Sequence, residues 1–143
     1  GYVSRMDTLQ AGVLSVRLRN LPSVIERRRR NAALYQDLLD PACVFFPPDR
    51  NTEFNTFHTF VVQVDQRDEL QRHLADQGIG SAIHYPIPIH LQPAAKDLGY
   101  ETGSMPQTER QAGRILTLPV NQFLTEEQVR QAAETVNAFC AKA

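Results

Sequence analysis

The sequence predicts an α+β domain with a small sheet of three or four strands, helices packed on one face of that sheet, and an N-terminal helical arm. Apolar residues recur at helical spacing near both ends of the chain, and short apolar runs closed by prolines lie between them. Of the 143 residues, 42% are hydrophobic and 22% are charged, which is typical of a globular domain. We therefore expect one domain over residues 1–143.

The first third of the chain is expected to be helical. Ser4 or Asp7 can cap a helix, and the apolar residues within 9–16 recur on one face of it. Pro22 should break that helix and restart a second one, which Pro41 ends. The expected arrangement is a helical hairpin or a bent pair of helices.

The rest of the chain alternates short strands with helices. The predicted strands cover residues 43–46, 56–64, 79–84 and 115–119. Asp65 should cap a helix that Gly78 ends. Residues 93–106 are expected to be a loop or loosely helical, and one or two helical turns follow at 108–113. Thr125 and Gln128 form a capping box that begins the final helix.

Composition argues against several classes of function. A formal net charge of −1 does not suit a general nucleic-acid-binding protein. No apolar run is long enough to span a bilayer and no signal-peptide pattern opens the chain. Cys43 and Cys140 have no CxxC spacing and are interpreted as buried thiols of a cytoplasmic protein, and a disulfide between them is left open.

The stretch from His84 to Gln92 is the strongest candidate for a binding site. It places His84, Tyr85 and His90 among prolines directly after an apolar run, which predicts a strand that ends in a stiff loop. Rigid loops commonly carry binding groups, so a polar ligand or a partner is expected here.

Other groups of residues favour ordinary structural roles. A metal site built on His58, His84 and His90 is disfavoured, because no cysteine or carboxylate stands beside them at ligand spacing. The four arginines at 27–30 wrap around a helix, and we interpret them as a solvated face with one arginine at an interface. No nucleophile has an activating neighbour. The sequence therefore predicts no catalytic residue and no metal ligand.

Seven segments of the chain follow one another in a specific order: Gly1–Ala11, Arg28–Tyr35, Arg67–Leu70, Gly78–Ile79, His84–Gln92, Leu118–Pro119 and Leu124–Thr125. In this order they resemble the C-terminal small domain of the DegT/StrS-type sugar aminotransferases. These are pyridoxal-phosphate enzymes of the aspartate aminotransferase fold type. The resemblance covers essentially the whole chain.

The resemblance implies a homodimeric enzyme that moves an amino group from glutamate or glutamine to a nucleotide-linked keto sugar. His84 and Tyr85 would reach toward the sugar nucleotide in the neighbouring subunit's site, and Arg5 would lie near the cofactor end of the same interface. An imidazole and a phenol on a stiff loop can hydrogen-bond sugar hydroxyls or phosphates at little ordering cost. The family pattern has Asn where this chain has Val3, and valine cannot donate to the cofactor phosphate.

A transaminase of this type needs a lysine that forms a Schiff base with pyridoxal phosphate. Neither Lys96 nor Lys142 matches the family's lysine, which lies upstream of the segment that matches Gly1. We therefore expect a fragment or truncated product that lacks the large cofactor-binding domain and is inactive alone. The alternative hypothesis is a stand-alone, non-catalytic binding or dimerisation module derived from this fold.

Overall fold

A two-stranded antiparallel sheet lies at the centre of the molecule. The computed structural model describes residues 5–50 and 52–142, and in it β1 (Phe60–Gln63) pairs with β2 (Ile115–Leu118). Single antiparallel bridges add Phe45 beside β1 and Ala82 beside β2, so two further predicted strands reach the sheet at one residue each. The α+β fold class is confirmed, and the regular part of the sheet has two strands.

β1 is shorter than the strand expected over residues 56–64. Phe57 has φ 47°, a left-handed conformation that interrupts the extended backbone just before His58. Phe60 and Val62 are buried, as the period-two pattern predicts. His58, which was expected on the same face, is exposed and belongs to a loop.

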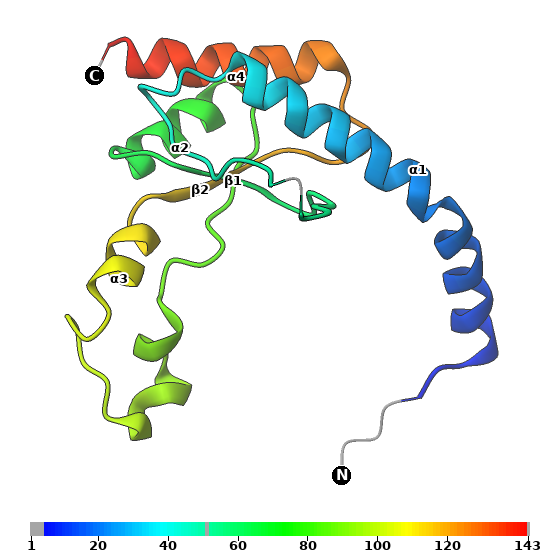
Figure 1. Ribbon diagram of the computed structural model, residues 1–143, viewed down its shortest axis with the longest axis horizontal. Coiled ribbons are helices and arrows are strands. Elements are labelled where there is room, and N and C mark those ends of the chain that lie inside the picture. The colour runs from blue at the N-terminus through cyan, green and yellow to red at the C-terminus, as the bar shows by residue number, and fades with distance from the viewer. Residues whose placement is uncertain (1–4, 51, 143) are drawn as a thin grey trace.

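Three helices pack together on one side of this sheet (Figure 1). The C-terminal part of α1 (Thr8–Leu38) lies along α4 (Glu126–Cys140), and α2 (Arg67–Asp76) contacts both α4 and β2. Each large apolar side chain buried between these elements stabilises the fold by about 1.5–3 kcal/mol. The largest fully buried ones are Tyr35, Val44, Val62, Leu70, Leu74, Leu116, Leu118, Val129 and Val136.

α1 is a single helix of 31 residues, so the break expected at Pro22 is wrong. Proline removes one main-chain N–H and crowds the preceding turn, at a cost of about 3 kcal/mol relative to alanine. Near the proline, Asn20 Nδ2 donates to the Val16 carbonyl at 3.2 Å, and the Ser23 hydroxyl donates to the Asn20 carbonyl at 2.9 Å. The helix continues through Pro22, and Figure 1 shows it curving instead of folding back as a hairpin.

The helix starts follow the expected chemistry with one exception. Asp7 occupies the N-cap of α1. Thr125 and Gln128 exchange hydrogen bonds at 3.0 and 3.2 Å and begin α4, as the capping box predicts. α2 has Gln66 at its N-cap, so the prediction that Asp65 caps it is wrong by one residue.

A disulfide joins Cys43 and Cys140, whose Cα atoms lie 5.7 Å apart. The interpretation of these residues as buried thiols is therefore wrong, and the disulfide that the sequence left open is present. Asn137 supports the same junction, because its Nδ2 donates to the Leu38 carbonyl at 2.9 Å and its Oδ1 accepts from the Asp40 N–H at 3.0 Å. The end of α1 and the end of α4 are thus tied together twice.

Two projections leave the same side of the helix-covered sheet (Figure 1). One is the N-terminal half of α1, residues 8–21, which we call the arm. The other is residues 84–113, which we call the lobe; it contains the 3-10 helices Ile89–Leu91 and Pro93–Leu98 and the helix α3 (Pro106–Ala112). Within the described ranges, no helix combines the length and the apolar character needed to cross a membrane.

Candidate functional site

His84 and Tyr85 line a hollow beside the sheet, where the lobe begins. The hollow has a volume of about 570 Å³. Its lining comes from α1, the turn before β1, both strands of the sheet, the start of the lobe and the segment that follows β2. Its polar lining includes Arg28, His58, His84, Tyr85, Thr117 and Asn121, and no carboxylate of the described residues lines it.

The His84 ring is fixed by a residue of the sheet. His84 Nδ1 lies 3.0 Å from Thr117 Oγ1, and Thr117 is buried next to the bridge that it forms with Ala82. The Tyr85 ring stands edge-on to the imidazole, with ring centroids 5.4 Å apart, and 70% of Tyr85 is exposed. Because Nδ1 is used by Thr117, Nε2 is the ring nitrogen left to meet a ligand.

Residues of α1 hold two other walls of the hollow. Arg28 Nη1 donates to the carbonyl of His58 at 2.8 Å and to that of Phe57 at 3.2 Å. Asn31 is buried, and its Nδ2 donates to the Asn121 carbonyl at 2.9 Å. The hollow therefore has its lining backbone fixed by long-range hydrogen bonds, which reduces the cost of ordering it around a ligand.

The lobe is braced internally by a buried histidine and a glutamate. His90 Nε2 lies 3.0 Å from Glu109 Oε1, and the His90 ring stands edge-on to Tyr100. The Glu109 carboxylate also accepts the N–H of Gly103 at 2.8 Å and that of Met105 at 3.1 Å. These hydrogen bonds, first from Gly103, then from Met105 and His90, hold the pKa of Glu109 below its ordinary value.

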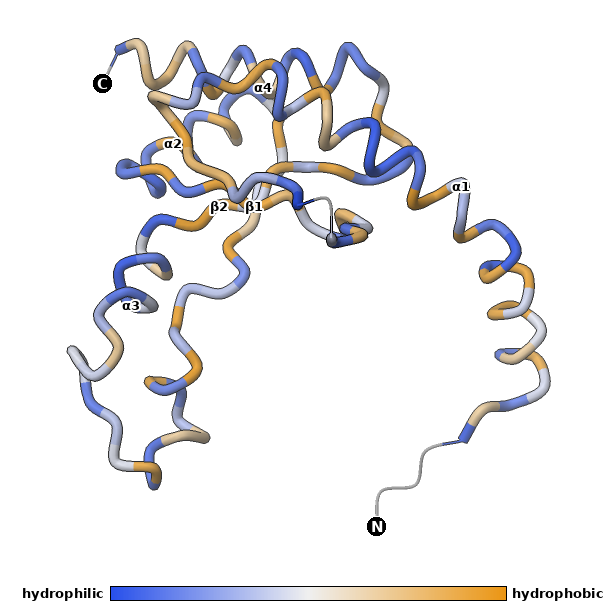
Figure 2. Tube along the Cα trace, in the orientation of Figure 1, coloured by the Kyte–Doolittle hydropathy of each residue, from blue (hydrophilic) through white to orange (hydrophobic). Residues whose placement is uncertain are grey.

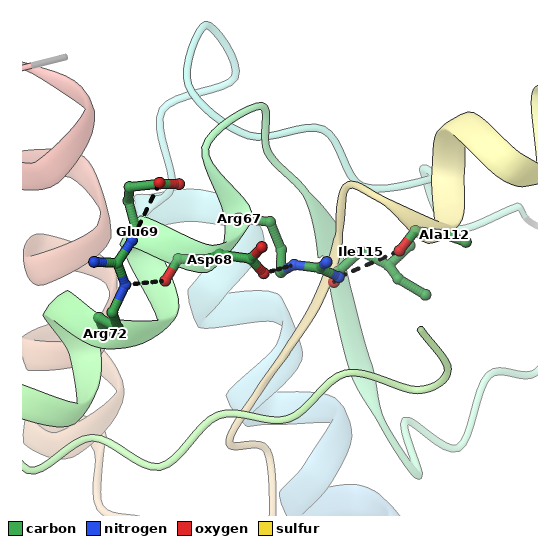
Figure 3. Close-up of polar contacts among 6 residues, drawn as sticks. All are labelled: Arg67, Asp68, Glu69, Arg72, Ala112 and Ile115. Carbon is green, nitrogen blue, oxygen red and sulfur yellow. Dashed lines mark hydrogen bonds and ion pairs between the residues drawn. The ribbon is translucent and has the colours of Figure 1, made fainter. Parts of the chain in front are cut away.

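Arg67 braces the base of the lobe from α2 (Figure 3). Its Nη1 donates to the carbonyls of Ala112 at 3.2 Å and Ile115 at 3.4 Å, where α3 passes into β2. The neighbouring Asp68 forms an ion pair with the same guanidinium and orients it. Tyr85 therefore stands at the foot of a lobe that is held to the body of the domain at both of its ends.

Arg5 and the two lysines lie away from this hollow. Arg5 is exposed and lines a separate apolar hollow along the arm, together with Met6 and Leu9. Lys96 is exposed on the second 3-10 helix of the lobe, and Lys142 follows the end of α4. Val3 lies outside the described residues.

The three histidines of the metal hypothesis do not converge. His58 and His84 line the hollow, whereas His90 is taken up by Glu109 in the lobe. Among residues 5–50 and 52–142, no three His, Cys, Asp or Glu side chains are grouped in a way that could hold a metal ion.

Comparison with known proteins matches this chain to one family. Residues 1–137 match the model of the DegT/DnrJ/EryC1/StrS aminotransferase family. The erythromycin biosynthesis sensory transduction protein EryC1 of Saccharopolyspora erythraea is 41% identical over 96% of this chain and 38% of its own length. The dTDP-3-amino-3,6-dideoxy-alpha-D-galactopyranose transaminase of Aneurinibacillus thermoaerophilus is 34% identical over 97% of this chain and 38% of its own length.

A solved structure agrees over the entire chain. DesV of Streptomyces venezuelae, in complex with a ketimine intermediate, superimposes with a TM-score of 0.93 and 34% identity, covering 100% of this chain and 39% of that one. The chain thus spans well under half the length of the relatives it matches. The resemblance drawn from the seven sequence segments is confirmed: the chain belongs to the DegT/DnrJ/EryC1/StrS aminotransferase family.

Proposed function

We propose that this chain is the C-terminal portion of a pyridoxal-phosphate-dependent aminotransferase acting on a nucleotide-linked keto sugar, and that His84 and Tyr85 contact the sugar nucleotide. The observation that carries the proposal is the hollow in which an imidazole and a phenol stand together at the foot of a braced lobe. Both groups can hydrogen-bond hydroxyl or phosphate oxygens. The relative from A. thermoaerophilus, by its name, acts on a dTDP-linked sugar, which supports this class of substrate.

The residues of this chain do not by themselves fit the cofactor. Members of the family use pyridoxal phosphate, which an aminotransferase holds through a lysine. Lys96 and Lys142 both lie outside the lining of the hollow. We therefore place the cofactor lysine in the part of the enzyme beyond this chain, with Arg5 near the cofactor end of the interface. The chain alone should bind substrate weakly and should not transaminate.

The arm supports assembly with further protein. Figure 2 shows hydrophobic residues along its length, and Leu9, Val13, Leu14 and Leu18 are largely exposed. A run of uncovered apolar side chains of this extent usually marks an interface. A large cofactor-binding domain and a second subunit of a homodimer are the partners that the family implies.

A cytoplasmic enzyme remains part of this proposal. The disulfide between Cys43 and Cys140 does not by itself favour a cytoplasmic location, because disulfides persist mainly in oxidising compartments.

An activity assay and a binding measurement test the proposal. The isolated chain is given pyridoxal phosphate, a keto-sugar nucleotide and glutamate, and no amino sugar is expected. Formation of amino sugar above that of a His84→Ala control would show that the chain is catalytically complete. Thymidine diphosphate should shift the resonances of His84 and Tyr85 saturably, and unchanged resonances of both residues would overturn their assignment to the substrate.

The exposed arm also favours the second candidate, a non-catalytic dimerisation module. Sedimentation analysis separates the two. Self-association that weakens in Leu14→Asp, together with no response to thymidine diphosphate, would favour the module. A monomeric chain that responds to thymidine diphosphate would favour the aminotransferase portion.

A further inference from the structure

The turn of residues 54–58 is held by two of the four consecutive arginines of α1. Arg29 Nη1 donates to the Asn55 carbonyl at 2.6 Å, and its guanidinium carbon lies 4.8 Å from the centre of the Phe54 ring. Arg28 donates to two further carbonyls of this turn, those of Phe57 and His58. Two half-buried guanidinium groups thus bind three main-chain carbonyls of one short turn.

The same turn contains a strained residue. Phe57 has φ 47°, a left-handed conformation that is uncommon and strained for a residue with a side chain. Its ring is buried beside Phe60, and its N–H donates to Asn55 Oδ1 at 2.9 Å. Burial of Phe57 together with this backbone conformation turns the next residue, His58, outward to the hollow. Backbone strain that a fold maintains in this way is concentrated at functional sites.

The charge around the hollow selects a class of ligand. In the part of the chain that the structure describes, Arg28, His58 and His84 are the lining groups able to carry positive charge, and the lining contains no Asp or Glu. Within residues 5–50 and 52–142, the His58 imidazole makes no hydrogen bond, although its main chain is fixed by Arg28. A free imidazole on a fixed turn, between a guanidinium and a second histidine, suits a ligand oxygen that carries negative charge.

We propose that His58 is a further ligand-binding residue, that it contacts an anionic oxygen, and that Arg28 and Arg29 are its positioning residues. This inference rests on the proposed function, under which two ligands carry such oxygens. These are the diphosphate of the sugar nucleotide and the carboxylates of the amino donor. The sequence analysis interpreted the four arginines at 27–30 as a solvated face with one arginine at an interface. That interpretation is wrong, because Arg28 and Arg29 both donate hydrogen bonds to carbonyls of the 54–58 turn.

The experiment follows the four histidine rings of the full chain by NMR, with ¹³C-labelled histidine, while pyrophosphate or glutamate is added. Pyrophosphate is expected to shift His58 and His84 together with one dissociation constant, and His73, on α2, is the internal reference. His58→Ala, an exposed change that should not affect folding, is expected to weaken pyrophosphate binding about 10-fold.

The positioning role has its own matched pair of variants on one helix. Arg28→Ala should abolish the His58 shift while the His84 shift is retained, whereas Arg27→Ala, an exposed neighbour, should behave as the parent. A shift of His58 with glutamate alone would assign the anion to the amino donor. If the resonances of His84 shift on adding a probe while those of His58 do not, and His58→Ala binds pyrophosphate as tightly as the parent chain, this inference is overturned and the proposed function still stands. Unchanged His58 and His84 resonances with every probe would overturn both.

Discussion

Reduction of the Cys43–Cys140 disulfide should destabilise the domain strongly. The bond joins residues 97 apart in sequence, so it ties the chain just after α1 to the last residue of α4. In the chain-entropy model, a cross-link that closes a loop of about 100 residues removes about 4.7 kcal/mol of unfolded-state entropy. The magnitude is therefore close to the upper end of what one disulfide can contribute.

The folded junction itself should persist after reduction. Asn137 independently hydrogen-bonds the main chain at Leu38 and Asp40, so the two helix ends stay close in the folded state without the sulfur bridge. Cross-links commonly contribute less than the chain-entropy model predicts, so we expect a measured loss of about 3 kcal/mol, within the typical range for one disulfide. For a domain of this size that corresponds to a fall in Tm of about 10 °C.

The assay is thermal unfolding followed by circular dichroism, with and without a thiol reductant. The double variant Cys43→Ser, Cys140→Ser is the control: it should unfold near the reduced parent and be insensitive to the reductant. Oxidised and reduced parent protein that unfold at the same temperature, with the oxidation state verified by mass, would refute the reasoning. In that case the junction would be held by Asn137 and the core alone.

Three further predictions concern stability. Lowering the pH should destabilise the lobe as Glu109 is protonated, because backbone hydrogen bonds hold the pKa of Glu109 below its ordinary value. The stabilisation is fully present above the ordinary glutamate pKa, and it is lost as the pH falls through the lowered pKa of Glu109. Hydrogen exchange of lobe amides should show this loss in the parent, and Glu109→Gln should flatten the pH dependence; equal profiles would contradict it. Asn137→Ala should cost about 1–3 kcal/mol in urea unfolding, since it leaves main-chain groups without partners, while the exposed Glu134→Ala on the same helix should cost little. Leu116→Ala should cost about 2–5 kcal/mol and Leu98→Ala, 70% exposed, well under 1 kcal/mol; similar values for the two would mean that β2 does not border the core.

Local patterns indicated most of the elements and the candidate ligand groups. Period-two burial on β1, the capping box at Thr125 and the proline-closed runs identify strands and helix starts, because each depends on residues a few positions apart. The His84–Tyr85 pair was predictable for the same reason, since a strand that runs into prolines must end in a loop. The order of short segments was enough to identify the family.

The tertiary structure decided which distant groups meet. The disulfide, the contact of His84 with Thr117 and the pairing of His90 with Glu109 join residues 97, 33 and 19 positions apart, and no local preference encodes such pairs.

Packing also overruled local signals in two places. α1 runs through Pro22 although proline disfavours a helix interior, because propensity is a weak preference that the rest of a long helix can outweigh. Arg28 appeared to be one charge among four, and only the docking of the 54–58 turn against α1 gave its guanidinium carbonyl partners. The sequence alone thus indicated most of the helices and strands and the family, and it predicted His84 and Tyr85 as ligand-binding residues. The shape of the hollow and the placing of His58 in it depend on contacts between residues far apart in the chain.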